Sequence, residues 1–342
     1  MALQQGIFTT IEEADKVAGQ ISIVSSGMWS GGVGTLNSFY TSSTQSGSTG
    51  QYYLDAYQGV VGSDATASIQ FSAAYGNFAG SGSKTGDADY AASKAIYRQF
   101  RNLLLPQSTN YFLLNGPAGT ETTESKEIFA ISVNRSRLKE KMDPGNWELQ
   151  LSGSATAGTR LHLIDDSGAT SDPTVKNTTR EFNIISGSIV SGAVVKPTTD
   201  ITYGKFYPET GVIILDVIAC GGATFFSGYA TPTNSDSNNT QRFYHAISGG
   251  AYFASRREES IRSTHYFCRV KHDMYNHSQN PTYFTASDNQ LTVPSFRTDP
   301  QSYITTVGLY NGSNELLAVA KLSRPVLKSS SREALIKVRL DF

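Results

Sequence analysis

Short apolar runs alternate with polar turn segments along most of the chain after Tyr111. Runs of this length, rich in aromatic and β-branched side chains and bounded by turn residues, are typical of strands. The pattern therefore predicts an α+β protein dominated by β-structure, with antiparallel sheets or a sandwich, a few short helices and an extended N-terminal arm. The predicted strands are Phe129–Val133, Leu161–Ile164, Phe182–Ile185, Val212–Leu215 and Tyr266–Val270.

The C-terminal segment has the clearest β-pattern. Ile304–Tyr310 and Leu316–Leu322 flank Asn311-Gly312, a strong tight-turn signal, and we expect a hairpin there. Apolar and polar residues then alternate from Ala334 to Phe342, which predicts a strand with one buried face. Such a strand must pair within its own sheet or with another chain.

The main helix is expected over 89–105, after Gly86. Its apolar residues recur at three- and four-residue intervals, Asp87 or Asp89 can cap it, and Pro106 ends it. Lys94, Arg98 and Arg101 form a basic face, for which we favour a solvated surface over an anion site. Shorter helices are predicted over Thr10–Gly19, Ser136–Met142 and Arg256–Arg262.

The first part of the chain differs in composition from the rest. The tract Ser25–Gly50 is rich in Gly, Ser and Thr and contains too little apolar surface to offset the loss of backbone entropy on ordering. We therefore predict an arm or assembly region over 1–88, ordered by its neighbours, and a β-rich body over 89–342. The body contains the helix 89–105, the hairpin and the terminal strand.

Composition narrows the classes of partner. The 342 residues carry a formal net charge of -1, and only 17% of them are charged, below the usual quarter. This charge balance favours neither nucleic acid nor an anionic membrane as a binding partner. We also expect neither a secretory signal nor a membrane-spanning segment. Cys220 and Cys268 are the two cysteines, which excludes a disulfide framework and leaves one bridge open.

Two segments suggest ligand chemistry but fit it poorly. Gly80-Ser81-Gly82-Ser83-Lys84-Thr85 resembles a phosphate loop, but Ser83 stands where that motif needs Gly, so we favour a polar loop. His265, Cys268, His272 and His277 offer zinc donors at a spacing that matches no usual site. We interpret them as a half-buried strand followed by a polar loop.

Catalytic patterns are equally weak. Asp165-Asp166 precedes Ser167-Gly168 and is interpreted as a turn, and the adjacent carboxylates Glu258-Glu259 do not face each other across a bond. His245 and Ser248 lie near each other without a nucleophile-elbow motif. We therefore assign no catalytic, cofactor-binding or metal-ligating residue, no cofactor and no enzymatic activity.

Several segments resemble structural proteins of bacteriophage particles. Asp299–Asn311 followed by Asn314–Pro325 resembles hairpins in virion proteins of tailed phages. Phe129–Lys139 leading to Asp143–Leu149 is similar to a structural protein of large contractile-tailed phages of the T-even-like type, notably those infecting cyanobacteria. The resemblance to phage structural proteins extends to Ala95–Leu105, Ala246–Ala251 and Ser263–Phe267.

The resemblance implies a non-enzymatic component of a contractile tail, with a baseplate wedge subunit as the preferred position. Neck, sheath-associated and fibre-attachment positions stay open. The implied partners are other tail or baseplate proteins and copies of this chain, in a virion assembled in the host cytoplasm, with at most indirect contact with the host surface. The rival classes are a glycan-degrading enzyme with two converging carboxylates and a glycan-binding module, whose aromatic groove could use Tyr252, Phe253, Tyr283 and Phe284.

Overall fold

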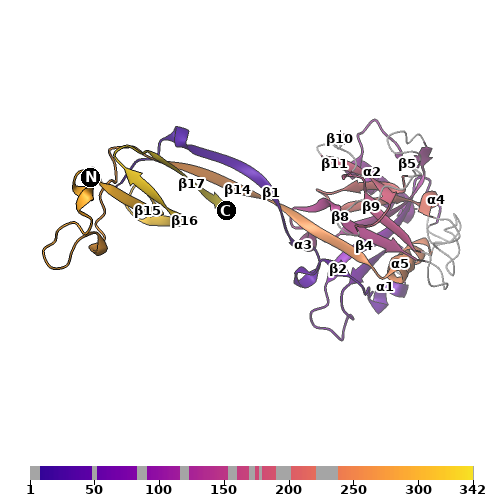
Figure 1. Cartoon of the computed structure of the whole chain (residues 1–342). Helices are drawn as coiled ribbons and strands as arrows, with labels where there is room; N and C mark the ends of the chain where they lie inside the picture. Colours follow the sequence, from indigo (N-terminus) through magenta and orange to yellow (C-terminus); the bar gives the residue numbers. More distant parts are fainter. Residues whose placement is uncertain are drawn as a thin grey trace. The chain divides into compact units, whose positions relative to one another are not determined.

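The computed structural model of the chain is dominated by strands in large antiparallel sheets, with a few short helices, which confirms the predicted fold class (Figure 1). The structure describes residues 8–47, 52–82, 91–115, 123–152, 160–168, 174–176, 179–189, 202–220 and 238–341. The chain divides into a larger unit, residues 22–259, and a smaller unit, residues 1–21 with 260–342. The boundaries fall inside two neighbouring strands, β1 (Lys16–Gly27) and β14 (Phe253–Val270).

The larger unit is built on one continuous sheet. From β14 the strands follow in the order β14-β8-β9-β11-β12-β13-β7-β4-β3, and neighbours pair antiparallel. The bounds are β3 (Tyr53–Tyr57), β4 (Ile69–Asn77), β7 (Glu127–Val133), β8 (Lys141–Leu151), β9 (Leu161–Asp165), β11 (Thr179–Ser186), β12 (Gly204–Tyr207) and β13 (Val212–Asp216). Two short strands pair at the sides of this sheet, β2 (Thr35–Leu36) with β14 and β10 (Thr174–Lys176) with β11. Two others, β5 (Phe112–Asn115) and β6 (Thr123–Ser125), form a separate two-stranded sheet.

Strand β7 is buried on both faces, which explains its nearly continuous apolar sequence. Phe129 and Ile131 point into the main core, where the ring of Phe129 stacks on Phe243 at 4.3 Å between centroids. Ile128 and Ala130 point to the opposite face and join a second core. The alternation of a strand thus separates two apolar layers in this unit.

A helix covers each of these two layers. α2 (Ala91–Leu104) contributes Tyr97, Phe100 and Leu104 to the second core, and α5 (Asn239–Gly250) contributes Phe243 and Ile247 to the main core. α2 ends before Pro106 and confirms the predicted helix, of which residues 89 and 90 lie outside the described residues. The remaining helices are short: α1 (Ser43–Gly47), α3 (Arg135–Leu138) and α4 (Val217–Cys220).

The smaller unit pairs β17 (Ala334–Asp341) with β14 and packs the hairpin of β15 (Gln301–Tyr310) and β16 (Leu316–Ser329) on them (Figure 1). Its core contains Leu309 of the hairpin and Ile336 and Val338 of β17. The predicted hairpin and the predicted terminal strand are both confirmed, and Phe342 lies outside the described residues.

Three predicted short helices are corrected. Arg256–Arg262 is part of strand β14, because Glu258 pairs with Lys141 across the sheet. Thr10–Gly19 contains only a single 3₁₀ turn before strand β1 begins. Of Ser136–Met142 only the first residues are helical, since Lys139 adopts a φ of 55° and β8 begins at Lys141.

The division of the chain differs from the expected arm over 1–88 and body over 89–342. Strands β3 and β4 lie within the sheet of the larger unit, and β4 pairs with β7 from Phe71 to Asn77. The buried residues of this strand include Phe71 and Tyr75 of the main core together with the small Ala73 and Ala74. Part of the Gly/Ser-rich tract, residues 48–50, lies outside the described residues.

Candidate functional site

A group of large apolar side chains is exposed on the hairpin of the smaller unit. Leu316, Leu317 and Val319 have 52%, 67% and 58% of their surface exposed, and Tyr310 and Phe8 lie beside this group with 45% and 37% exposed. We call these five residues the hairpin patch. Clusters of exposed apolar side chains of this kind are typical of interaction surfaces.

The patch exists because the first residues of β16, Leu316 to Ala320, are apolar on both faces of the strand. Ala318 and Ala320 point inward and join the core formed with Ile336 and Val338, whereas Val319 between them points outward. A strand with one buried face normally alternates apolar and polar residues. A valine at the outward position is therefore not explained by the packing within the smaller unit.

Gly308 shapes the surface of the patch. It lies opposite Val319 in the register of β15 and β16. A Cβ at Gly308 would come within 3.0 Å of Cε2 of Tyr310 and 3.3 Å of Cδ1 of Leu316, so these side chains lie across the glycine backbone. The ring of Phe8 meets the ring of Tyr310 edge-on at 5.0 Å. The side chains of Tyr310, Leu316 and Phe8 thus form an apolar surface over the backbone of Gly308.

The smaller unit also has open strand edges. Among the described residues, β17 pairs only with β14 and β16 pairs only with β15. Each therefore has a second edge whose backbone N–H and C=O groups can pair with another strand. An apolar surface beside open edges is suited to contact with another protein.

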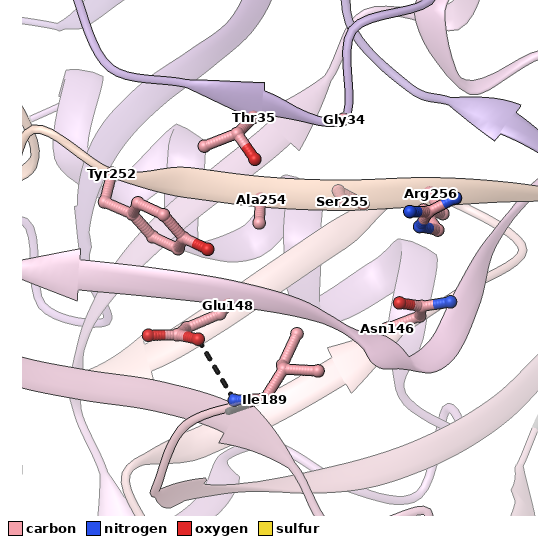
Figure 2. A pocket seen from close by; sticks show the side chains of 9 residues that line it. All are labelled: Gly34, Thr35, Asn146, Glu148, Ile189, Tyr252, Ala254, Ser255 and Arg256. Carbon is pink, nitrogen blue, oxygen red and sulfur yellow. Dashed lines mark hydrogen bonds between the residues drawn. The ribbon is translucent and has the colours of Figure 1, made fainter. Parts of the chain in front are cut away.

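A second candidate site is a hollow of about 250 Å³ in the larger unit (Figure 2). Ala254 of β14 lies opposite Glu148 of β8 and Thr35 of β2. Tyr252 directly precedes β14, Arg256 follows Ala254 on that strand, and all three residues line the hollow. The small side chain of Ala254 thus leaves a space between a ring and a guanidinium group.

Glu148 is a buried polar group of this hollow with several hydrogen-bond partners. Its Oε1 lies 2.9 Å from Nδ1 of His162 and accepts a hydrogen bond of 3.1 Å from Gln150 Nε2. Its Oε2 accepts a hydrogen bond of 3.1 Å from the backbone N–H of Ile189, drawn in Figure 2. With 4% of Glu148 exposed, the carboxylate is held in one orientation.

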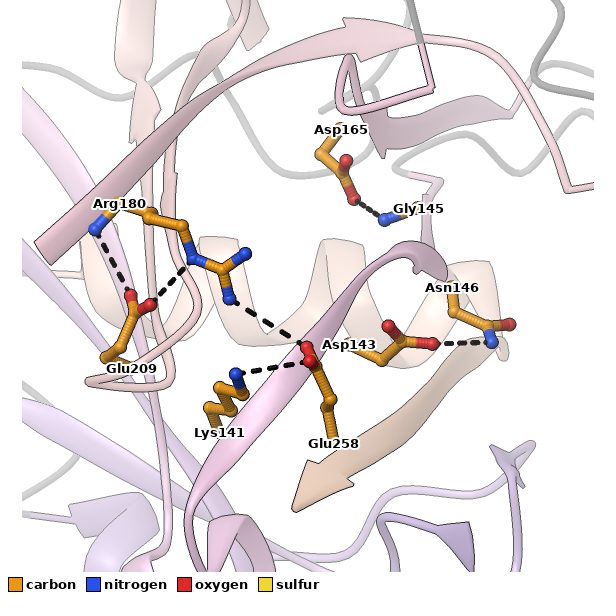
Figure 3. Close-up of polar contacts among 8 residues, drawn as sticks. All are labelled: Lys141, Asp143, Gly145, Asn146, Asp165, Arg180, Glu209 and Glu258. Carbon is orange, nitrogen blue, oxygen red and sulfur yellow. Dashed lines mark hydrogen bonds and ion pairs between the residues drawn. The ribbon is translucent and has the colours of Figure 1, made fainter. Parts of the chain in front are cut away.

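A polar network lies near the start of β8 (Figure 3). Glu209 accepts a hydrogen bond of 2.9 Å from Nε of Arg180, and Glu258 lies 3.1 Å from Nζ of Lys141 and 3.8 Å from Nη2 of Arg180. Asp143 accepts a hydrogen bond of 2.8 Å from Asn146. Each of these carboxylates is held by a neighbouring side chain.

Asp165 and Asp166 form the turn that the sequence predicts. The carboxylate of Asp165 accepts hydrogen bonds from the backbone N–H groups of Gly145 at 2.7 Å and Ser167 at 2.9 Å. Asp166 accepts two bonds from Asn183. Asp165 is fully buried, and this desolvation raises its pKa. It therefore fastens the turn after β9 to the bulge of β8.

The glycine-rich segment after β4 folds around a side chain of the protein. The N–H groups of Ala79, Gly80 and Ser81 all donate to Oδ1 of Asn77, at 2.9 to 3.2 Å. These are the amides that a phosphate loop would direct to its ligand. Residues 83–85 of the segment lie outside the described residues.

The residues considered as zinc donors lie in the smaller unit. His265 and Cys268 are half-buried on β14, and His272 and His277 follow in the exposed loop, as the sequence predicts. Within the described ranges no group of three or more His, Cys, Asp or Glu side chains is arranged to hold a metal ion. Cys220 and Cys268 are both free thiols.

The four aromatic residues considered for a groove lie in different surroundings. Phe253 is fully buried between Trp29 and Phe71, whereas Tyr252 lines the hollow. Tyr283 and Phe284 pack on each other in the smaller unit. Arg101 of the predicted basic face donates hydrogen bonds to the backbone carbonyls of Gln107 and Thr109. The adjacent carboxylates Glu258 and Glu259 form ion pairs with Lys141 and Lys139, respectively. His245 and Ser248 both lie on α5.

Neither the hairpin patch nor the hollow is evident from sequence alone. Both depend on register, which brings Val319 opposite Gly308 and Ala254 opposite Glu148. The available signal was the run of apolar residues from Leu316 to Ala320 and the small Ala254 between Tyr252 and Arg256.

Comparison of the chain with protein-family models, curated proteins and solved structures gave no match. Among the described residues, every helix is too short or too polar to cross a membrane.

Proposed function

We propose that this chain is a non-enzymatic structural component of a contractile phage tail, with the baseplate as its preferred position. Support comes from the resemblance of its β-hairpin and strand segments to virion proteins and from the low charge of the chain. The structural observation on which the proposal depends most is the hairpin patch. A surface of Tyr310, Leu316, Leu317 and Val319 is suited to burial against a neighbouring subunit.

Low charge supports close packing of subunits. With 17% charged residues and a net charge of -1, neighbouring copies repel one another weakly. Interfaces between permanent partners are more apolar than ordinary surface, and charged residues are depleted at their centres. The hairpin patch matches this composition, since its five members are uncharged and Lys321 is the next outward side chain along β16.

The preferred occupant of the patch is a neighbouring tail protein. The open edges of β16 and β17 lie in the same unit as the patch and can accept a strand of that neighbour. Strand addition would bury both backbone groups and the exposed leucine and valine side chains. Repetition of such a contact by the symmetry of a tail would hold the subunit in fixed geometry.

Incorporation of patch variants into particles tests this proposal. A phage that lacks the gene is complemented with the wild-type chain, with Leu317→Lys plus Val319→Lys, or with Thr305→Lys, which adds a lysine at an exposed polar position of β15. We expect the double variant to be depleted from particles at least tenfold and Thr305→Lys to be incorporated normally. Normal incorporation of a soluble, folded double variant would contradict the use of the patch.

A further inference from the structure

The hollow beside Ala254 contains polar groups of both hydrogen-bonding types. Glu148 supplies a buried carboxylate that accepts, and Arg256 supplies an exposed guanidinium that donates. Asn146 extends from β8 beside them, and Figure 2 shows these side chains around one space. A ligand that fills it must therefore both donate and accept hydrogen bonds.

Tyr252 adds an apolar wall to this space. Its ring lies on one side of Ala254, beside Thr35 of β2, and lines the hollow. Burial raises the pKa of Tyr252, and the negative charge of Glu148 adds to this effect. Because Tyr252 and Glu148 both line the hollow, one small ligand can contact the ring and the carboxylate.

The carboxylate of Glu148 can accept a further hydrogen bond from a ligand. A carboxylate has about four acceptor sites, and His162, Gln150 and the N–H of Ile189 occupy three of them. These contacts hold the group in place before any ligand arrives, which lowers the entropic cost of binding.

We propose that this hollow binds a single saccharide unit. The hydroxyl groups of a pyranose both donate and accept, so one ring can meet Glu148 and Arg256 together, while its C–H face packs on Tyr252. The volume of about 250 Å³ is below the range for drug-sized ligands, which favours one sugar ring over a larger molecule. The inference goes beyond the proposed structural role and does not depend on it.

Charge disfavours the main competing ligands. A phosphate or carboxylate ligand would be repelled by Glu148, and a simple ammonium ligand would be repelled by Arg256. A neutral, hydroxyl-rich ligand avoids both penalties. A free amino acid could match both charges at once, and it is therefore the alternative that the experiment must separate from a saccharide.

Saturation-transfer NMR and calorimetry with the full chain test the proposal. The probes are the methyl glycosides of glucose, galactose, mannose and N-acetylglucosamine, and free serine as the amino acid, each at up to about 10 mM because a small hollow is expected to bind in the millimolar range. We expect at least one glycoside to bind the wild-type chain. Ala254→Leu should abolish this binding by filling the hollow, and Glu148→Gln should weaken it about tenfold.

Matched controls separate the hollow from general effects on folding. Ala79→Leu makes the same change at an exposed position of the larger unit, and Glu209→Gln neutralises a carboxylate in the Arg180 ion pair. Both controls should bind like wild type. If Ala254→Leu does not fold by circular dichroism, Arg256→Gln replaces it, because its exposed side chain is not part of a core.

Two results would overturn the proposal. One is a wild-type chain that binds none of the four glycosides or binds serine alone. The other is a glycoside that binds equally well to folded Ala254→Leu, Glu148→Gln and Arg256→Gln variants, which would place the sugar elsewhere on the molecule.

Discussion

The indole Nε1–H of Trp29 donates a 2.8 Å hydrogen bond to the backbone carbonyl of Phe253, which lies 224 residues further along the chain. The two rings also meet edge-on at 4.8 Å between centroids, and both residues are almost completely buried. This contact ties the segment after β1 to the start of β14. It is one of the long-range contacts that organise the main core of the larger unit.

Replacing Trp29 with Phe should destabilise the larger unit more than the same change at Trp147. The Trp29 variant leaves the buried carbonyl of Phe253 without this donor, whereas Nε1 of Trp147 has no partner among the described residues. The difference should be about 1–3 kcal/mol in the free energy of unfolding. Urea unfolding followed by fluorescence of the remaining tryptophan measures it, and equal losses would contradict the prediction.

Gly250→Ala should disturb the contact between α5 and β8. A Cβ at this position would lie 1.8 Å from the carbonyl oxygen of Gln150, so the end of the helix must move. We expect a loss of about 1–3 kcal/mol in unfolding free energy. Gly34→Ala is the control, since its Cβ meets no atom within 4 Å. Comparable losses in the two variants would argue against the close approach of α5 to β8.

The stability of the larger unit should depend on pH through Glu127. Burial raises the pKa of Glu127, and the nearby negative charge of Asp216 raises it further. The folded state therefore holds the proton more tightly than the unfolded state. The contribution of Glu127 to stability falls as the pH rises from the unfolded pKa, about 4.3, through the raised folded value.

Glu127→Gln should accordingly stabilise the folded state more at pH 7 than at pH 4. Asp64→Asn should show the opposite sign, because hydrogen bonds from Thr66 lower the pKa of Asp64. Urea unfolding of both variants at the two pH values measures the difference. A stability change of Glu127→Gln that is the same at pH 4 and pH 7 would refute the assignment.

Adjacent residues of β16 should respond differently to lysine. Val319 is exposed, so Val319→Lys should change the free energy of unfolding by no more than about 0.5 kcal/mol. Ala320 packs in the core of the smaller unit, and Ala320→Lys should cause a much larger loss by placing an ammonium group there. Thermal unfolding distinguishes the two, and similar losses would mean that Val319 is needed for the fold itself.

Local sequence pattern predicted β7, β9, β11, β13, the end of β14 and the C-terminal strands β15 to β17, but not β1 to β4, β8 or β12. Val212–Leu215 lies within β13, and Asn311-Gly312 lies in the connection between β15 and β16, as expected from strand periodicity and turn chemistry. The predicted helix over Arg256–Arg262 was wrong, because it was inferred from the clustering of charged residues alone. In the structure, cross-strand pairing with β8 determines the conformation of Arg257 and Glu258, an example of tertiary contacts overriding local preference.

The candidate sites were less predictable than the strands because they depend on pairing between distant segments. Ala254 leaves a hollow only because Glu148 and Thr35 lie opposite it. Similarly, β4 was included in the predicted N-terminal arm, because its burial comes from β7 and α2, which lie further along the chain. Periodicity identifies the buried face of a strand but not the neighbour that covers it.

The most direct test of the central proposal is quantitative mass spectrometry of particles from the phage that encodes this chain, separated into heads, tails and baseplates. The account predicts that the chain is enriched in baseplates or tails at a fixed ratio to the tail-tube protein that follows the symmetry of the tail. Absence of the chain from purified particles would contradict the proposed structural role.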